Sequence, residues 1–165
     1  MFAGGLDSPR SYRRYVLGMH RFAADYEIVV RALPRQSAWL ADDLTCLALA
    51  PLSAAGTRRP AALAATRLGW DYVMAGSSMG ARRMLREARR LGYQDGAGAS
   101  FLTRHAASGD WDAMRQQLDA LDAGDVPRMA QAEAGACAAF ALVLGCFERS
   151  FDRIPQDDPG APHAS

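Results

Sequence analysis

Two glycines spaced four apart, Gly76 and Gly80, have a type and spacing typical of close helix packing or of a ligand site. They interrupt a segment in which large apolar side chains recur at helical spacing. Each glycine inside a helix costs about 1 kcal/mol relative to alanine, although alanine is abundant in this chain. Residues four apart lie on one face of a helix, so the pair leaves part of that face without Cβ atoms. Such a face lets a flat or bulky group approach the backbone.

Two interpretations of this glycine face stay open. Another helix packs closely over it, or a ligand lies against it. Ser77 and Ser78 lie between the glycines, and serine hydroxyls that bond back to the preceding turn bend a helix.

The segment 72–80, Tyr-Val-Met-Ala-Gly-Ser-Ser-Met-Gly, resembles the distal-helix signature of bacterial haem oxygenases of the bacteriophytochrome-associated type, roughly Tyr-Val-Leu-Glu-Gly-Ser-x-Leu-Gly. In that family the helix kinks at its glycines and its backbone lies over the haem plane. The resemblance implies that Gly76 and Gly80 are the catalytic residues, lying against the macrocycle with carbonyls that help to hold distal water. It also implies that Ser77 lies beside them and that Tyr72 lines the pocket. The chain departs from the signature at Ala75, where the family usually has glutamate.

The activity implied by the resemblance is the oxidative opening of haem to biliverdin, iron and carbon monoxide, with O₂ and external electrons. Haem is then both cofactor and substrate. The alternative is a non-catalytic binding or interaction protein with the same fold, in which the glycines only pack helices.

The resemblance also predicts an iron ligand that this chain does not match. Haem oxygenases hold iron through a histidine on their first helix, and Met1-Phe2 begins where that helix has already ended. Three explanations stay open: the start is assigned too late, the protein is a degenerate relative, or another group has replaced the ligand. His20 is the first candidate for such a replacement, although it lies at the flank of an apolar stripe, about 100° from Met19 around the helix axis.

A basic cluster follows the glycines, consisting of Arg82, Arg83, Arg86, Arg89 and Arg90 with only Glu87 opposing them. One interpretation is a solvated face whose cations favour the helix C-terminus. The other is an anion site, either for haem propionates or for an acidic redox partner. The resemblance favours a partner, an electron donor such as ferredoxin or a flavoprotein reductase, at 82–90.

Composition predicts an all-α fold in a single domain. The chain has 165 residues, 50% hydrophobic, with few β-branched residues, and we expect about six helices in a haem-oxygenase-like domain over 1–154. A disordered tail is expected over 155–165. The net charge of +1 argues against a general nucleic-acid binder. The three cysteines have no Cys-x-x-Cys spacing and no signal peptide is evident, so we expect buried, reduced thiols in a cytoplasmic protein.

Helix boundaries follow from caps and breakers. Ser8 and Pro9 begin a helix that Pro34 ends, a second runs from Ser37 to Leu49, and the glycine helix continues to Leu91. In the second, Asp42 and Asp43 are expected to be a solvated pair, one of them bonded to a nearby backbone.

Three further expectations concern the C-terminal half of the chain. His105 is expected to be exposed at the end of a short helical turn. Asp110 and Asp125 are expected to cap the last two helices. The uncharged run 134–147 is shorter than the roughly 20 residues of a membrane-spanning helix, so we expect no membrane span and a buried central helix with Phe140 and Phe147 facing other helices.

Overall fold

The computed structural model describes residues 6–121 and 124–154, and its named elements in these ranges are helices, apart from two isolated backbone bridges around Gln94. The expected all-α fold class is confirmed. The expected tail over 155–165 lies outside the described residues. The helices are α1 (Pro9–Val30), α2 (Gln36–Cys46), α3 (Ala64–Arg90), α4 (Ser100–Ala106), α5 (Asp110–Asp119) and α6 (Val126–Arg153).

Most of the predicted helix starts are confirmed and several helix ends are not. Ser8 caps α1 with its side chain, and Pro9 is the first helical residue. The helix ends at Val30 because Arg31 adopts a left-handed conformation with φ 62°, and Val30 lies four positions before the predicted breaker Pro34. The helix α2 likewise stops at Cys46, short of Leu49.

Of the caps predicted for the last two helices, one is confirmed and one is wrong. Asp125 caps α6, as predicted, by accepting a hydrogen bond from the Arg128 N–H. The prediction for α5 was wrong, since Gly109 is its cap and Asp110 is its first residue.

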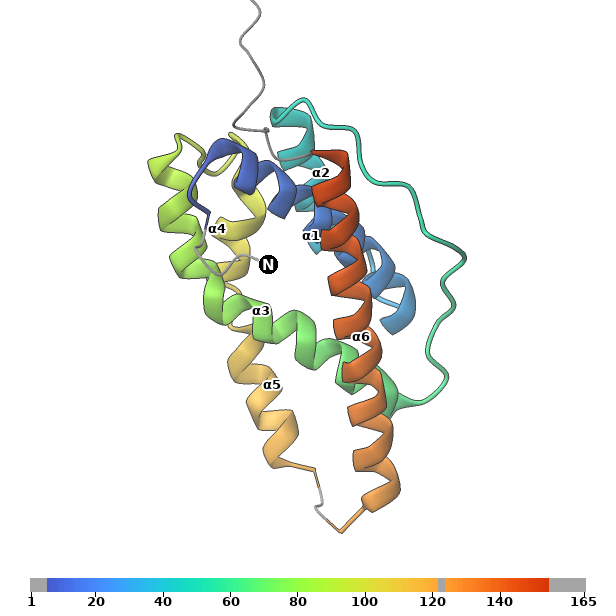
Figure 1. Cartoon of the computed structure of the whole chain (residues 1–165). Helices are drawn as coiled ribbons and strands as arrows, with labels where there is room; N and C mark the ends of the chain where they lie inside the picture. Colours follow the sequence, from blue (N-terminus) through green and yellow to red (C-terminus); the bar gives the residue numbers. More distant parts are fainter. Residues whose placement is uncertain (1–5, 122–123, 155–165) are drawn as a thin grey trace, which may run out of the picture.

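The long helices α3 and α6 cross where each has a glycine, and α3 is visibly curved along its length (Figure 1). A Cβ on Gly69 would clash with the backbone of α6 at Ala132, Gly135 and Ala136. A Cβ on Gly135 would clash with the backbone of Thr66 on α3. The close helix crossing therefore depends on Gly69 and Gly135, and not on the pair Gly76 and Gly80.

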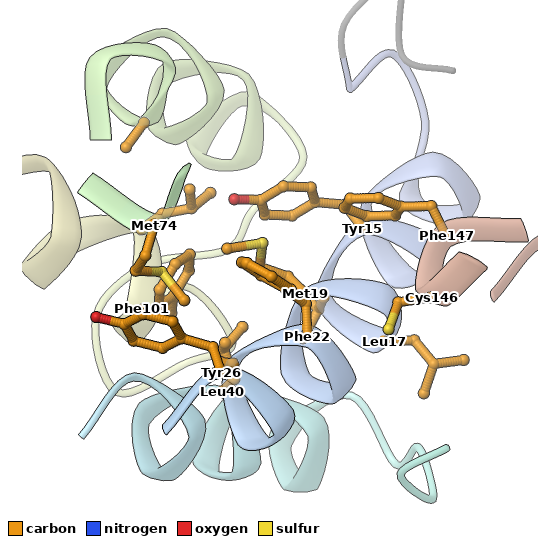
Figure 2. Close-up of a cluster of buried hydrophobic side chains, with 14 of the residues drawn as sticks. Tyr15, Leu17, Met19, Phe22, Tyr26, Leu40, Met74, Phe101, Cys146 and Phe147 are labelled. Carbon is orange, nitrogen blue, oxygen red and sulfur yellow. The ribbon is translucent and has the colours of Figure 1, made fainter. Parts of the chain in front are cut away.

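The core is built mainly around α1, whose aromatic and apolar side chains are shown in Figure 2. The prediction that α6 is the buried central helix was wrong: Phe140 is 56% exposed and Leu144 48% exposed, while Phe147 is buried against α1. Within the described ranges α6 alone has the length and apolar composition of a membrane-crossing helix, and in this fold it packs against α3 and α1.

Two smaller expectations were also wrong in part. Cys46 and Cys137 are exposed, and of the three free thiols only that of Cys146 is buried. Asp42 is exposed, but Asp43 is buried and accepts hydrogen bonds from the backbone N–H groups of Ser100 (2.7 Å) and Phe101 (2.9 Å). Asp43 is on α2 and thus holds the start of α4 against that helix, although the two helices are distant in the sequence.

Candidate functional site

A cavity of about 430 Å³ opens between α1, α3 and α6. Its size falls in the range of small-molecule sites. The four residues that the sequence analysis singled out as binding residues, Tyr72, Gly76, Ser77 and Gly80, all line it. The rest of the wall is almost wholly apolar, consisting of Tyr15, Met19 and Phe22 from α1, Val73, Met79 and Met84 from α3, and Phe140, Val143 and Phe147 from α6.

The glycine face of α3 is open to this cavity. A Cβ on Gly76 would have its nearest contact with a ring carbon of Trp111, at 3.7 Å, and one on Gly80 with the methyl of Met84, at 3.6 Å. Both are ordinary van der Waals distances to side chains, so no helix backbone packs over this face. Of the two interpretations left open by the sequence, the geometry favours a ligand surface.

Both serines between the glycines bond back into their own helix. The Ser77 hydroxyl donates to the Met74 carbonyl and the Ser78 hydroxyl to the Ala75 carbonyl, each at 2.7 Å. Such bonds compete with the helical ladder and favour bending. The helix stays continuous through the glycines, and its curvature is consistent with the bend expected from the sequence (Figure 1).

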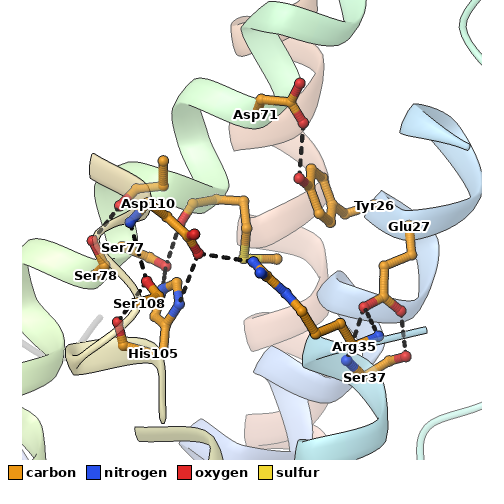
Figure 3. A network of polar contacts seen from close by, with 12 residues as sticks. Tyr26, Glu27, Arg35, Ser37, Asp71, Ser77, Ser78, His105, Ser108 and Asp110 are labelled. Carbon is orange, nitrogen blue, oxygen red and sulfur yellow. Dashed lines mark hydrogen bonds and ion pairs between the residues drawn. The ribbon is translucent and has the colours of Figure 1, made fainter. Parts of the chain in front are cut away.

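His105 is buried, so the prediction of an exposed side chain was wrong. Its ring stacks on Phe101 with centroids 4.8 Å apart, and its Nε2 lies 2.7 Å from the Ser77 hydroxyl oxygen (Figure 3). Since that hydroxyl already donates to Met74, the bond to His105 requires Nε2–H as donor. Sequence reasoning missed this contact because the two residues are 28 positions apart and meet only through the packing of α4 on α3.

Burial keeps the His105 imidazole neutral near pH 7. It lowers the pKa of His105 to about 4, with the Arg35 cation acting in the same direction and the Asp110 carboxylate against it. The other ring nitrogen, Nδ1, lies 3.9 Å from an Asp110 oxygen and has no hydrogen-bond partner among the described atoms. His105 therefore holds its proton on the side that faces Ser77, a residue of the cavity wall.

A polar group of side chains continues this arrangement on the opposite face of α3. Asp110 forms an ion pair with Arg35 at 2.9 Å, and the Tyr26 hydroxyl donates to Asp71 at 2.8 Å (Figure 3). These four residues line a small cavity of about 160 Å³. Burial raises the pKa of Asp71, although the Tyr26 hydrogen bond opposes that shift. The helix α3 thus has an apolar wall on one side and a charged, hydrogen-bonded wall on the other.

Neither described histidine lines the large cavity. His20 is half-buried on the flank of α1, as the sequence indicated, and burial lowers its pKa. The side chains of the wall that can coordinate a haem iron are the phenols of Tyr15 and Tyr72 and the thioethers of three methionines. Within the described ranges no cluster of three or more His, Cys, Asp or Glu could hold a metal ion.

The basic cluster after the glycines is fully on the surface. All five of its arginines are exposed. Arg83 pairs with Glu87 at 3.0 Å, and Glu87 also accepts a hydrogen bond from the Leu6 N–H, which is the main reason that its pKa is lowered. The other four arginines, Arg82, Arg86, Arg89 and Arg90, have no hydrogen bond or ion pair within the described part of the chain, and they form a cationic strip on the surface of α3.

No protein-family model and no curated protein matches this chain. Among solved structures it is similar to the haem oxygenase from Neisseria meningitidis, studied in its NO- and CO-bound forms for what they imply about oxygen activation. The TM-score is 0.70 with 22% sequence identity, over 96% of this chain and 84% of that chain. At this level of identity the similarity shows the fold: the chain has the haem oxygenase fold.

Proposed function

We propose that this chain binds haem in the cavity between α1, α3 and α6 and acts as a haem oxygenase, of the bacteriophytochrome-associated type. The observation that carries the proposal is the bare glycine face of α3: Gly76 and Gly80 line the cavity, and neither is covered by another backbone. The similarity of the fold to a haem oxygenase supports the same conclusion.

The cavity suits a flat, largely apolar ring. The backbone at Gly76 and Gly80 offers a surface without side chains on one side, while Tyr15 and Phe147, which stack at 6.1 Å, form part of an aromatic wall (Figure 2). Polar groups are few in this wall. Burial of an apolar ring here would be favoured at roughly 25 cal/mol per Å² of apolar surface removed from water.

Bound haem would supply the iron that binds O₂ and the ring that is opened to biliverdin, iron and carbon monoxide, with electrons from an external donor. The contribution of the chain is a hydroxyl and a neutral imidazole at the glycine face. Ser77 presents its oxygen at the cavity wall, and His105 holds a proton 2.7 Å from that oxygen. These two groups can hold, and hand over, a proton at the Ser77 oxygen.

Haem binding by this protein is expected to be weak, because the cavity wall offers phenols and thioethers in place of a histidine. A titration of haem into the purified protein, followed by the Soret band, measures this affinity. Tight, saturable binding that is unchanged in His20→Ala would mean that the iron ligand is a residue of the cavity wall. Methionine and tyrosine variants would then identify that ligand.

The second candidate function is a non-catalytic haem-binding or interaction protein of the same fold. It is favoured by Ala75, which replaces the usual glutamate of the signature with a buried methyl group. Single-turnover reaction of the haem complex with O₂ and a reductant distinguishes the two candidates. Conversion of the Soret band to a bilin spectrum, with release of carbon monoxide, supports the enzyme; a stable complex under the same conditions supports the binding protein.

A further inference from the structure

Three tyrosines form a continuous stack that leads away from the cavity. Tyr15 lines the cavity, and its ring stacks with that of Tyr12, with centroids 6.4 Å apart and planes inclined by 28°. Tyr12 stacks in turn with Tyr93, at 4.5 Å and 21°. Separations of this order are ordinary for aromatic pairs in a packed core, but here the pairs join end to end.

The outer end of this stack is partly exposed and follows closely on the end of α3, the helix that carries the cationic strip. Tyr93 follows α3 directly after Gly92 and is half-buried, whereas Tyr12 and Tyr15 are buried. The nearest members of the strip in the sequence are Arg89 and Arg90, at the end of α3. The stack therefore joins the cavity to the surface on which an acidic electron donor would dock.

We propose that Tyr15, Tyr12 and Tyr93 form a path for oxidising equivalents, which carries an electron vacancy from the cavity to the surface. The proposal rests on the binding of haem in the cavity. Its function is protection: a peroxide that reacts in the haem-loaded cavity without opening the ring is reduced by electrons drawn through the tyrosines, and the side chains of the cavity wall are spared from oxidation. An external donor docked at the cationic strip would then refill the vacancy at Tyr93.

The surroundings of the two inner tyrosines suit a relay and not an end point. The Tyr12 hydroxyl donates to the Gly98 carbonyl at 2.6 Å, and a carbonyl is too weak a base to take its proton. Burial raises the pKa of Tyr12 and of Tyr15, and the Asp43 carboxylate acts in the same direction on both. Burial also opposes a transient positive charge on either ring, and the negative charge of Asp43 offsets part of that cost.

The chemistry balances with hydrogen peroxide as oxidant. One peroxide accepts two electrons and two protons and becomes two waters. Both electrons leave one cavity through the same stack in succession: Tyr93 gives up one electron, its partial exposure allows its proton to leave to solvent, and the external donor restores Tyr93 before the second electron passes. Without an external donor each protein molecule stops at one phenoxyl radical on Tyr93, and the radicals of two molecules couple through a carbon–carbon bond that leaves a dityrosine link between two chains.

A competing path exists in the same cavity. Tyr72 also lines it, is 36% exposed and lies 5.7 Å from Trp111 between ring centroids. The site of cross-linking separates the two paths, because oxidation that stays at the cavity mouth marks Tyr72, whereas transfer through the stack marks Tyr93.

The test treats the haem-loaded protein with hydrogen peroxide and follows the tyrosyl radical by electron paramagnetic resonance and dityrosine by fluorescence and peptide mapping. We expect the link at Tyr93. Tyr93→Phe should abolish it, and Tyr12→Phe should lower its yield several-fold, because phenylalanine keeps the ring packing but is much harder to oxidise. Tyr26→Phe is the matched control, because Tyr26 is a buried tyrosine outside both the cavity wall and the stack, and it should leave the Tyr93 link in place. Cross-linking mainly at Tyr72, or a Tyr93 yield unchanged in Tyr12→Phe, would overturn the proposal.

A second arm tests the stack without haem. A ruthenium photo-oxidant is attached at the cavity wall through Phe140→Cys, in a background with Cys46→Ser and Cys137→Ser to remove the exposed thiols. Flash oxidation should produce a radical at Tyr93 that Tyr12→Phe suppresses, and an equal radical in that variant would overturn the path. If no Soret complex forms in the first arm, the proposed function fails while this arm still decides on the tyrosine path.

Discussion

Replacing Gly80 with leucine separates a ligand surface from a helix crossing. The substitution adds about four carbon atoms to the glycine face of α3. At Gly80 a new Cβ would have the Met84 methyl at 3.6 Å as its nearest contact, and the residue is exposed to the cavity. The added side chain therefore enters open space and need not displace any backbone.

The expected change in stability follows from this geometry. Overpacking, which typically costs about 1–3 kcal/mol, does not arise here. Removal of a glycine from the interior of a helix is favourable by roughly 0.5–1 kcal/mol. The free energy of unfolding of Gly80→Leu should therefore be unchanged or higher by up to about 1 kcal/mol. Haem binding should be lost, because the leucine side chain occupies the volume that the ring would fill.

The matched control is Gly69→Leu on the same helix. A Cβ there would meet the backbone of α6 at Ala132, Gly135 and Ala136, which can move only if the helices separate. We expect this variant to lose at least about 1–3 kcal/mol or to fail to fold. Urea unfolding followed by circular dichroism measures both variants, and a Soret titration measures haem binding by Gly80→Leu.

Two results would refute this reasoning. A loss of stability in Gly80→Leu similar to that in Gly69→Leu would mean that the glycine face is packed in solution. Normal haem binding by a stable Gly80→Leu protein would mean that the ring lies elsewhere.

The remaining predictions address the cationic strip, the backbone and the buried imidazole. The double variant Arg86→Glu and Arg90→Glu should slow the reduction of bound haem by an acidic donor and weaken its dependence on ionic strength, measured by stopped-flow; rates that are unchanged across salt concentrations would contradict a docking role. Ala48→Gly should raise the free energy of unfolding by about 0.5–1 kcal/mol, because Ala48 has φ 51°, and a lower value in urea unfolding would contradict this. Since the pKa of His105 falls from 6.5 to about 4 on folding, the unfolded chain binds more protons between these values, and stability should fall by about 3 kcal/mol as the pH is lowered through them. In His105→Gln this part of the pH dependence should disappear, and an unchanged pH profile would mean that another group causes it.

The all-α class and most helix starts were predictable from the sequence because they depend on local signals. Ser8 with Pro9 and Asp125 are caps that act within one turn of their own helices, and a cap satisfies backbone donors whatever the rest of the fold does. The end of α1 was not predictable in this way. Pro34 is a strong breaker, but the chain turns at Arg31, an arginine in a conformation usually left to glycine.

The environment of single side chains was harder to predict, because it depends on contacts between distant parts of the chain. Asp43 and His105 both have sequence neighbours typical of a surface, yet each is buried through α4, a helix of seven residues. For α6 the prediction was wrong in the opposite direction, because side chains expected to be buried are exposed. The apolar run of α6 indicated a core helix, but Phe140 is largely exposed and lines the cavity.

The two glycine pairs show why spacing alone could not assign the site. Gly76 and Gly80 have the spacing associated with helix packing, whereas Gly69 and Gly135 lie far apart in the sequence and show no motif. The crossing of α3 and α6 nonetheless uses the second pair, because each backbone passes over the other at those residues. Once that crossing is made, α3 and α6 are held together at one point, and the next two turns of α3 face the cavity with Gly76 and Gly80 uncovered. The crossing is thus closed by another pair of glycines, and packing between helices does not account for the cost of Gly76 and Gly80 in the interior of α3.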